Sequence, residues 1–125
     1  MKSKILIVDD ASYLRELMFI YFENAGFVAL TAADGEEGLH LAKAEKPDAI
    51  ITDLDMPKMD GLQLLAAIKA DVRWRQVPVV MITTEGGEAK VAEAVRLGAA
   101  GYVRKPFTAD QIKEKLTGLL ESVNA

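Results

Sequence analysis

Five short apolar runs alternate along the chain with longer segments in which apolar residues recur at helical spacing. The runs are apolar throughout, without alternating polar residues, which is typical of strands buried on both faces of a parallel sheet. They are Lys4–Val8, Phe27–Ala32, Asp48–Asp53, Pro78–Thr83 and Gly101–Arg104. A helix is predicted after each run, so the chain is expected to form five strand and helix units.

The predicted helices are bounded by residue types that favour helix ends, with acids or a hydroxyl before them and glycines after them. They comprise Ala11–Ala25, a segment from Asp34 that ends before Pro47, a segment capped by Asp60, Ala89–Leu97, and a segment capped by Thr108. In the first helix the apolar stripe expected to face the sheet contains Leu14, Leu17, Met18, Tyr21 and Phe22.

Strands and helices in strict alternation predict an α/β fold with a parallel, doubly wound sheet that is covered by helices on both faces. The crossover connections are expected to be right-handed. The predicted elements use residues 1–125, so we expect one domain and no separate output domain.

Acidic residues stand where two of the predicted strands end. Asp53 ends the central strand before a turn marked by Pro57 and Gly61, and Asp9 and Asp10 follow the first strand. If these strands are adjacent and parallel, the three acids lie together beyond the strand ends, where ligands bind in open α/β sheets. Such a cluster must raise its pKa values or hold a cation, and we favour the cation. A solvated loop acid is the alternative for Asp53 taken alone.

Polar residues also follow the fourth and fifth strands. Thr83 and Thr84 end the fourth, and Lys105 with Pro106 follows the fifth. Together with the acids, this combination resembles the receiver domains of the response regulators of two-component signalling. The segments most similar to the chemotaxis-type single-domain receivers are Met81–Thr83, Gly98–Val103 and Lys105–Thr108.

The resemblance implies a flavodoxin-like sheet with strand order 2-1-3-4-5 and five helices. It also implies that Asp53 is the phosphoacceptor and that Thr83 and Lys105 bind the phosphoryl group. Asp9 and Asp10 are implied to be the acids of a Mg²⁺ site, because Mg²⁺ in proteins is held by a few carboxylates with waters and phosphate oxygens.

Further implied roles concern the metal and the output. The backbone carbonyl of Asp55 is expected to complete the Mg²⁺ site, and Tyr102 lies at the position of the family's switch aromatic. Two residues depart from the family pattern, since Asp55 stands where an amide is usual and Thr84 where a very small residue is usual. Both departures bear on the rates of phosphorylation and hydrolysis.

Composition narrows the classes of partner. The 125 residues include no cysteine and carry a formal net charge of −4, which excludes thiolate metal sites and argues against nucleic-acid binding. No apolar run is long enough to insert in a membrane. We therefore expect a cytoplasmic protein, and the resemblance implies a monomer that accepts a phosphoryl group from a sensor histidine kinase and binds an output protein through the last two helices and the last strand.

Three other functions are compatible with parts of the pattern. The chain can be an intermediate receiver of a phosphorelay. The Asp53-Leu54-Asp55 motif superficially fits a metal-dependent phosphohydrolase, although no stretch of sequence is available for a substrate pocket. A flavin-binding protein shares the topology, but Asp9 and Asp10 would repel a phosphate in the first loop. We expect no enzyme that turns over an external substrate.

Overall fold

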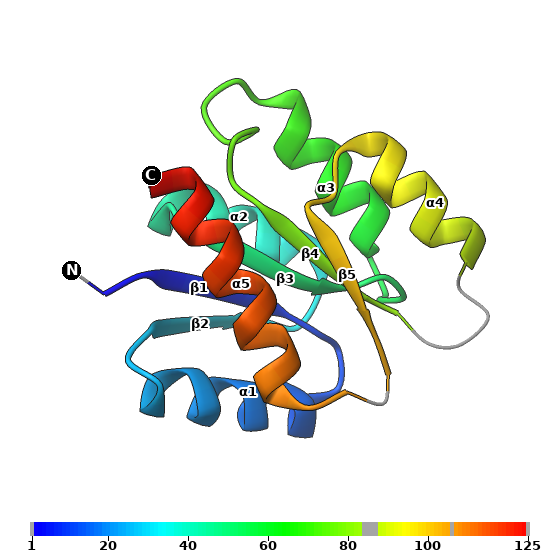
Figure 1. Cartoon of the computed structure of the whole chain (residues 1–125). Coiled ribbons are helices and arrows are strands. Elements are labelled where there is room, and N and C mark those ends of the chain that lie inside the picture. The colour runs from blue at the N-terminus through cyan, green and yellow to red at the C-terminus, as the bar shows by residue number, and fades with distance from the viewer. Residues whose placement is uncertain (1, 84–87, 106, 125) are drawn as a thin grey trace.

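The computed structural model describes residues 2–83, 88–105 and 107–124, and Figure 1 shows the strands forming one sheet with helices packed around it. The strands are β1 (Lys4–Val8), β2 (Val28–Ala32), β3 (Ala49–Asp53), β4 (Val79–Thr83) and β5 (Gly101–Arg104). The helices are α1 (Ser12–Asn24), α2 (Gly35–Glu45), α3 (Gly61–Ala70), α4 (Glu88–Leu97) and α5 (Ala109–Asn124).

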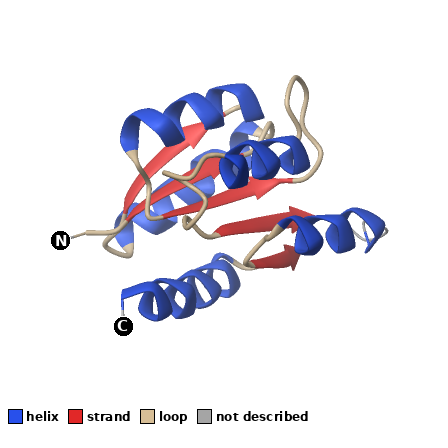
Figure 2. Cartoon of the chain, turned by 90° about the horizontal axis from the view of Figure 1, so that it is seen from above, coloured by secondary structure: helices blue, strands red, loops and turns tan. Residues whose placement is uncertain are grey.

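The sheet has the order β2-β1-β3-β4-β5, and every neighbouring pair is parallel. In Figure 2 all the strand arrowheads accordingly point the same way. The predicted fold class and strand order are confirmed. Because β1 and β3 are neighbours, their carboxyl ends bring two of the acidic positions to one edge of the sheet.

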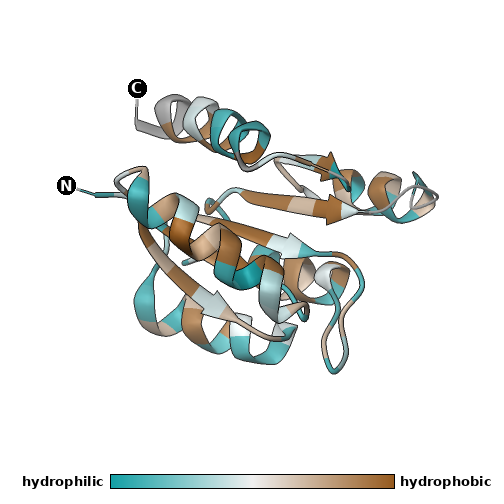
Figure 3. Ribbon diagram, turned by 90° about the horizontal axis from the view of Figure 1, so that it is seen from below, coloured by the Kyte–Doolittle hydropathy of each residue, from teal (hydrophilic) through white to brown (hydrophobic). Residues whose placement is uncertain are grey.

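Two apolar cores lie on the two faces of the sheet, and the strands appear largely in the hydrophobic colour in Figure 3. One face packs against α2, α3 and α4, and the other against α1 and α5. Strands β1, β3 and β4 contribute side chains to both cores, which explains why their sequences are apolar without alternation.

The helix caps follow the sequence signals. Asp34 accepts a hydrogen bond from Glu37 N at the start of α2, and Asp60 forms a capping box with Gln63 at the start of α3. Gly26 and Gly98, after α1 and α4, have φ of 96° and 105°, which L-residues rarely adopt. Helix α1 begins after Ala11 without a side-chain cap.

One helix face differs from the sequence prediction. Met18 and Phe22 of α1 are buried as expected, but Leu17 is 58% exposed. On a helix, Leu17 lies on the same side as Tyr13 and Ile20, which are 66% and 50% exposed, and this row faces away from the sheet. Apolar spacing alone did not separate the two rows, because both are continuous along the helix.

None of the helices in the described ranges is long and apolar enough to cross a bilayer.

Candidate functional site

The carboxyl ends of β1 and β3 hold two nearly inaccessible acids. Asp53 is the last residue of β3 and is 6% exposed, while Asp9 follows β1 and is fully buried. Asp9 Oδ1 accepts a hydrogen bond from Ala11 N at 2.9 Å, but its Oδ2 has no hydrogen-bond partner among the described residues. Burial raises the pKa of Asp9, the hydrogen bond from Ala11 lowers it, and the charge of Asp53 raises it, with a net upward shift.

Asp10 completes a cluster of three carboxylates. One ligand oxygen from each of Asp9, Asp10 and Asp53 lies within 4.8 Å of the others, and Asp10 is exposed to solvent. Three convergent carboxylates and an unpartnered buried oxygen on Asp9 form a donor set that suits a hard divalent cation. The acidic cluster predicted from the strand ends is therefore present and can bind a metal ion.

Lys105 is the cation of this cluster. Its Nζ donates a hydrogen bond to Asp53 Oδ2 at 3.0 Å, and the side chains of Lys105 and Asp53 are 24% and 9% exposed. Burial lowers the pKa of Lys105, but the hydrogen bond and charge of Asp53, together with the charges of Asp9 and Asp10, raise it by more, so the net shift is upward. The ammonium group is therefore fully protonated at neutral pH.

Thr83 is brought to the same edge by strand pairing. It is the last residue of β4, is 3% exposed, and its carbonyl accepts a hydrogen bond from Lys105 N at 2.7 Å. Asp53 lies opposite Ile82 in the β3 and β4 register, one residue before Thr83. Thr84 and Pro106, which also belong to the predicted constellation, lie outside the described residues.

The negative charge that Asp55 adds beside the site is partly offset by a lysine. Its backbone N donates to Asp53 Oδ1 at 3.3 Å, and its carboxylate forms an ion pair with Lys90 of α4. Both side chains are more than half exposed, so solvent screens the pair and it contributes little to stability. The sequence held no local signal for this contact, because the two residues are 35 positions apart.

Like Lys90, Arg15 makes a contact at the site that the sequence did not predict. Its Nη1 donates to the backbone carbonyl of Asp9 at 2.7 Å, which ties the turn carrying the acids to α1. The spacing of six residues across a strand end and a helix start is not a recognised motif. Only the fold brings the guanidinium back to this carbonyl.

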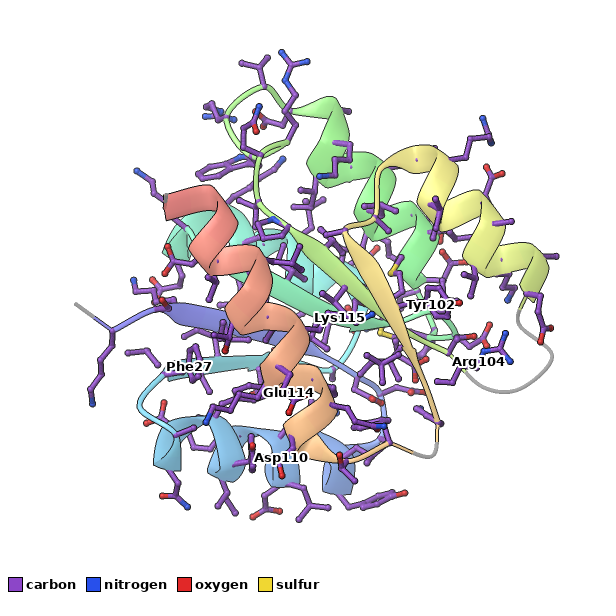
Figure 4. The ribbon with its side chains drawn as sticks, in the orientation of Figure 1. Phe27, Tyr102, Arg104, Asp110, Glu114 and Lys115 are labelled. Carbon is purple, nitrogen blue, oxygen red and sulfur yellow. The ribbon has the colours of Figure 1, made fainter. Side chains whose placement is uncertain are left out.

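The outer side of β5 and α5 carries the predicted switch residue. Tyr102 is 39% exposed, and Lys115 Nζ lies 5.8 Å from the centre of its ring while donating to the Tyr102 carbonyl at 3.1 Å. Arg104 points out on the same side of β5 and pairs with Glu88 at 3.4 Å (Figure 4). A surface cavity of about 370 Å³ is lined by Tyr102, Val103, Arg104, Gln111 and Lys115.

Comparisons with known proteins identify one family. Residues 5–117 match the model of the response regulator receiver domain. The chain is 41% identical to the chemotaxis protein CheY of Pseudomonas aeruginosa over 122 residues, covering 97% of this chain and 98% of that protein. It is 40% identical to the chemotaxis protein CheY1 of Helicobacter pylori strain J99, covering 94% and 96%. The high-resolution structure of the chemotaxis response regulator CheY4 of Vibrio cholerae has a TM-score of 0.89 to this chain at 33% sequence identity, covering 95% of this chain and 99% of that one.

Proposed function

The chain belongs to the response regulator receiver family, and from this premise we propose that it is a phosphorylation-dependent switch in chemotaxis signalling. A phosphoryl group from the phosphohistidine of a sensor kinase is accepted by Asp53, and the phosphorylated form binds an output protein. The observation that carries this proposal is the Asp53 carboxylate, paired with Lys105 Nζ at 3.0 Å beside the Asp9 and Asp10 acids.

The residues act on the phosphoryl group in complementary ways. An Asp53 oxygen attacks phosphorus, the bond from phosphorus to the imidazole nitrogen breaks, and the imidazole leaves with that electron pair. In this scheme Lys105 stabilises the charge that develops on the equatorial oxygens, and the Thr83 hydroxyl donates a hydrogen bond to one of them. Bound at Asp9, Asp10, Asp53 and the Asp55 carbonyl, Mg²⁺ would supply further charge stabilisation.

The same groups account for self-catalysed loss of the phosphoryl group, in which water replaces Asp53 on phosphorus. No external substrate is turned over in this scheme, which distinguishes the chain from a phosphohydrolase with a similar Asp53-Leu54-Asp55 motif. A phosphorelay intermediate would use the same chemistry but pass the phosphoryl group to a second histidine. The similarity to chemotaxis proteins over nearly the whole chain favours the switch. Its place of action is then the cytoplasm.

We assign the output face to α4, β5 and α5. The cavity beside Tyr102 is flanked by the cations of Arg104 and Lys115, so a partner segment with acids around an apolar anchor fits it. Phosphorylation draws Thr83 toward Asp53, and Tyr102 then turns into the space beside β5. With the usual range of coupling free energies, about 1–3 kcal/mol, the phosphorylated form binds its partner one to two orders of magnitude more tightly.

A second exposed apolar area lies on α1, and we assign it to the phosphodonor protein. Tyr13, Leu17 and Ile20 form its exposed row. A cavity of about 380 Å³ lined by Tyr13, Leu14, Lys105 and Phe107 connects the start of this helix with the lysine of the site. A protein that delivers a phosphoryl group must approach the carboxyl edge of the sheet, where α1 begins.

Labelling with acetyl phosphate tests the proposal. The wild type should take up at most one phosphoryl group per chain without sustained turnover of phosphate esters, and chelator should stop the reaction. Asp53→Asn should take up none, whereas Asp55→Asn should still be labelled because its backbone carbonyl is retained. Full, acid-stable labelling of Asp53→Asn would falsify the assignment, and sustained ester hydrolysis would favour the phosphohydrolase.

A further inference from the structure

The loop between β3 and α3, residues 54–60, carries Asp55 and contains one backbone hydrogen bond of its own, from Met59 N to Pro57 O at 2.9 Å. Its ends are fixed by a hydrogen bond from Gly61 N to Leu54 O at 3.0 Å and by the capping box of α3. Its middle contains Lys58 with φ of 67°, a left-handed conformation that side chains other than glycine disfavour. Strained residues of this kind persist only where the surrounding structure holds them.

Gly35, the first residue of α2, holds the middle of this loop. Its N–H donates to the carbonyl of Met59 at 3.0 Å. A Cβ at position 35 would lie 2.2 Å from the Met59 oxygen and 2.7 Å from the Met59 Cβ. The oxygen belongs to the backbone and cannot rotate away, so any side chain at position 35 must displace the loop or the helix start. Only glycine permits this approach.

Asp34 adds a weaker second contact. One carboxylate oxygen caps α2 by accepting from Glu37 N at 2.9 Å, and the other lies 3.9 Å from Lys58 Nζ. The Lys58 side chain is 67% exposed, so this ion pair is screened by solvent and contributes little. The steric fit and the hydrogen bond at Gly35 are therefore the stronger contacts between the start of α2 and the loop, whose Leu54, Met56 and Met59 also pack in or against one apolar core.

We propose that Gly35 is a positioning residue for phosphorylation, which holds loop 54–60 so that the Asp55 carbonyl faces the metal site. This inference rests on the proposed function, in which that carbonyl is a Mg²⁺ ligand. Residues that orient metal ligands without touching the metal typically change metal affinity by about 10-fold to 100-fold. Gly35→Ala should accordingly weaken Mg²⁺ binding by about 10-fold and raise the half-saturating Mg²⁺ concentration for labelling equally, with little change at saturating Mg²⁺.

Calorimetric titration with Mg²⁺ tests this, alongside thermal unfolding of each variant. Gly118→Ala is the matched control, because a Cβ there meets nothing within 4 Å, and it should bind Mg²⁺ as the wild type does. Leu116→Ala removes a fully buried side chain from the opposite face of the sheet and controls for lost stability. Asp34→Asn keeps the helix cap but removes the ion pair, and should change Mg²⁺ affinity by less than Gly35→Ala does.

Unchanged Mg²⁺ affinity in Gly35→Ala, or equal weakening in Leu116→Ala, overturns the positioning role. Asp10→Ala separates this failure from failure of the proposed function, because Asp10→Ala must weaken Mg²⁺ binding if the assigned metal site is correct. If Asp10→Ala binds as the wild type does, both the site and the inference are wrong.

A measurement on the wild type keeps the test independent of how well Gly35→Ala folds. If opening of the contact between Gly35 and Met59 weakens Mg²⁺ binding about 10-fold, Mg²⁺ at ten times its dissociation constant must slow hydrogen exchange at the Gly35 amide about fivefold. Amides of α5 give the reference for global opening. Slower exchange confined to Gly35 and its loop supports the proposal, and an unchanged Gly35 rate overturns it.

Discussion

Replacing Lys105 with methionine removes the ammonium group from the acidic cluster while keeping most of the side-chain stem. Lys105 Nζ donates to Asp53 Oδ2 at 3.0 Å, and Asp9 and Asp10 lie in the same cluster. Without this cation the three carboxylates repel one another, and two of them are almost inaccessible to water. The folded state of Lys105→Met should therefore be less stable than the wild type when no metal is bound.

The size of this effect follows from the burial of the pair. A hydrogen bond between charged groups contributes about 1.5–3 kcal/mol, and Lys105 is 24% exposed, which places the loss toward the lower half of that range. A loss of about 2 kcal/mol corresponds to a fall in Tm of roughly 8 °C for a domain of this size. Mg²⁺ can replace the missing charge, and at ten times its dissociation constant it stabilises a protein by about 1.4 kcal/mol.

Urea denaturation in EDTA and in excess Mg²⁺ measures the stability that Lys105→Met loses and the stability that Mg²⁺ restores. The variant should be clearly less stable than the wild type in EDTA, and Mg²⁺ should narrow the difference because the variant binds the metal more tightly. Lys113→Met on α5 is a suitable control, since Lys113 forms no ion pair with any described residue. Equal stabilities in EDTA, or a difference that Mg²⁺ leaves unchanged, would refute the electrostatic account of the cluster.

Three further predictions follow from the site. In EDTA, the raised pKa of Asp9 stabilises the folded state fully below the ordinary pKa of 3.8, and this contribution is lost as the pH rises through the raised pKa. The free energy of unfolding of Asp9→Asn should therefore change less with pH over that range. Asp10→Ala should impair labelling most at low Mg²⁺, which a titration of the rate against metal measures. Thr83→Ala should still be phosphorylated. Thr83→Ala and Tyr102→Ala, as single variants, should each reduce the difference in partner affinity between the unphosphorylated and phosphorylated forms, measured by calorimetry with the output partner.

The arrangement of the fold was predictable because each strand is a continuous apolar run bounded by turn residues. The bounds of β1 and β5 match the sequence prediction, Asp60 caps its helix as expected, and a helix follows Asp34 as expected. The order of the strands came from the family resemblance, since apolar runs alone do not specify which strands are neighbours. The acids at the ends of β1 and β3 then had to meet, because adjacent parallel strands end at one edge.

The contacts of the loops and the exposed face of α1 could not be predicted from the local sequence pattern. The ion pair of Asp55 with Lys90 and the approach of Gly35 to Met59 join segments that are distant in sequence, and both depend on how the loops pack. Leu17 was assigned to the buried stripe of α1, but a second apolar row on the same helix is exposed, and hydrophobicity alone does not say which row meets the sheet. These features concern loops and surfaces, where packing with distant segments decides the geometry.

The central claim is that the phosphoryl group is carried by Asp53, and mapping the modified residue in the wild type tests it most directly. The protein is treated with acetyl phosphate and Mg²⁺, the acyl phosphate is trapped by borohydride reduction, and the reduced residue is located by peptide mass spectrometry. We predict a single reduced position at Asp53, absent when EDTA is included. Modification at Asp9, Asp10 or Asp55 with Asp53 intact, or labelling that persists in EDTA, would contradict the account.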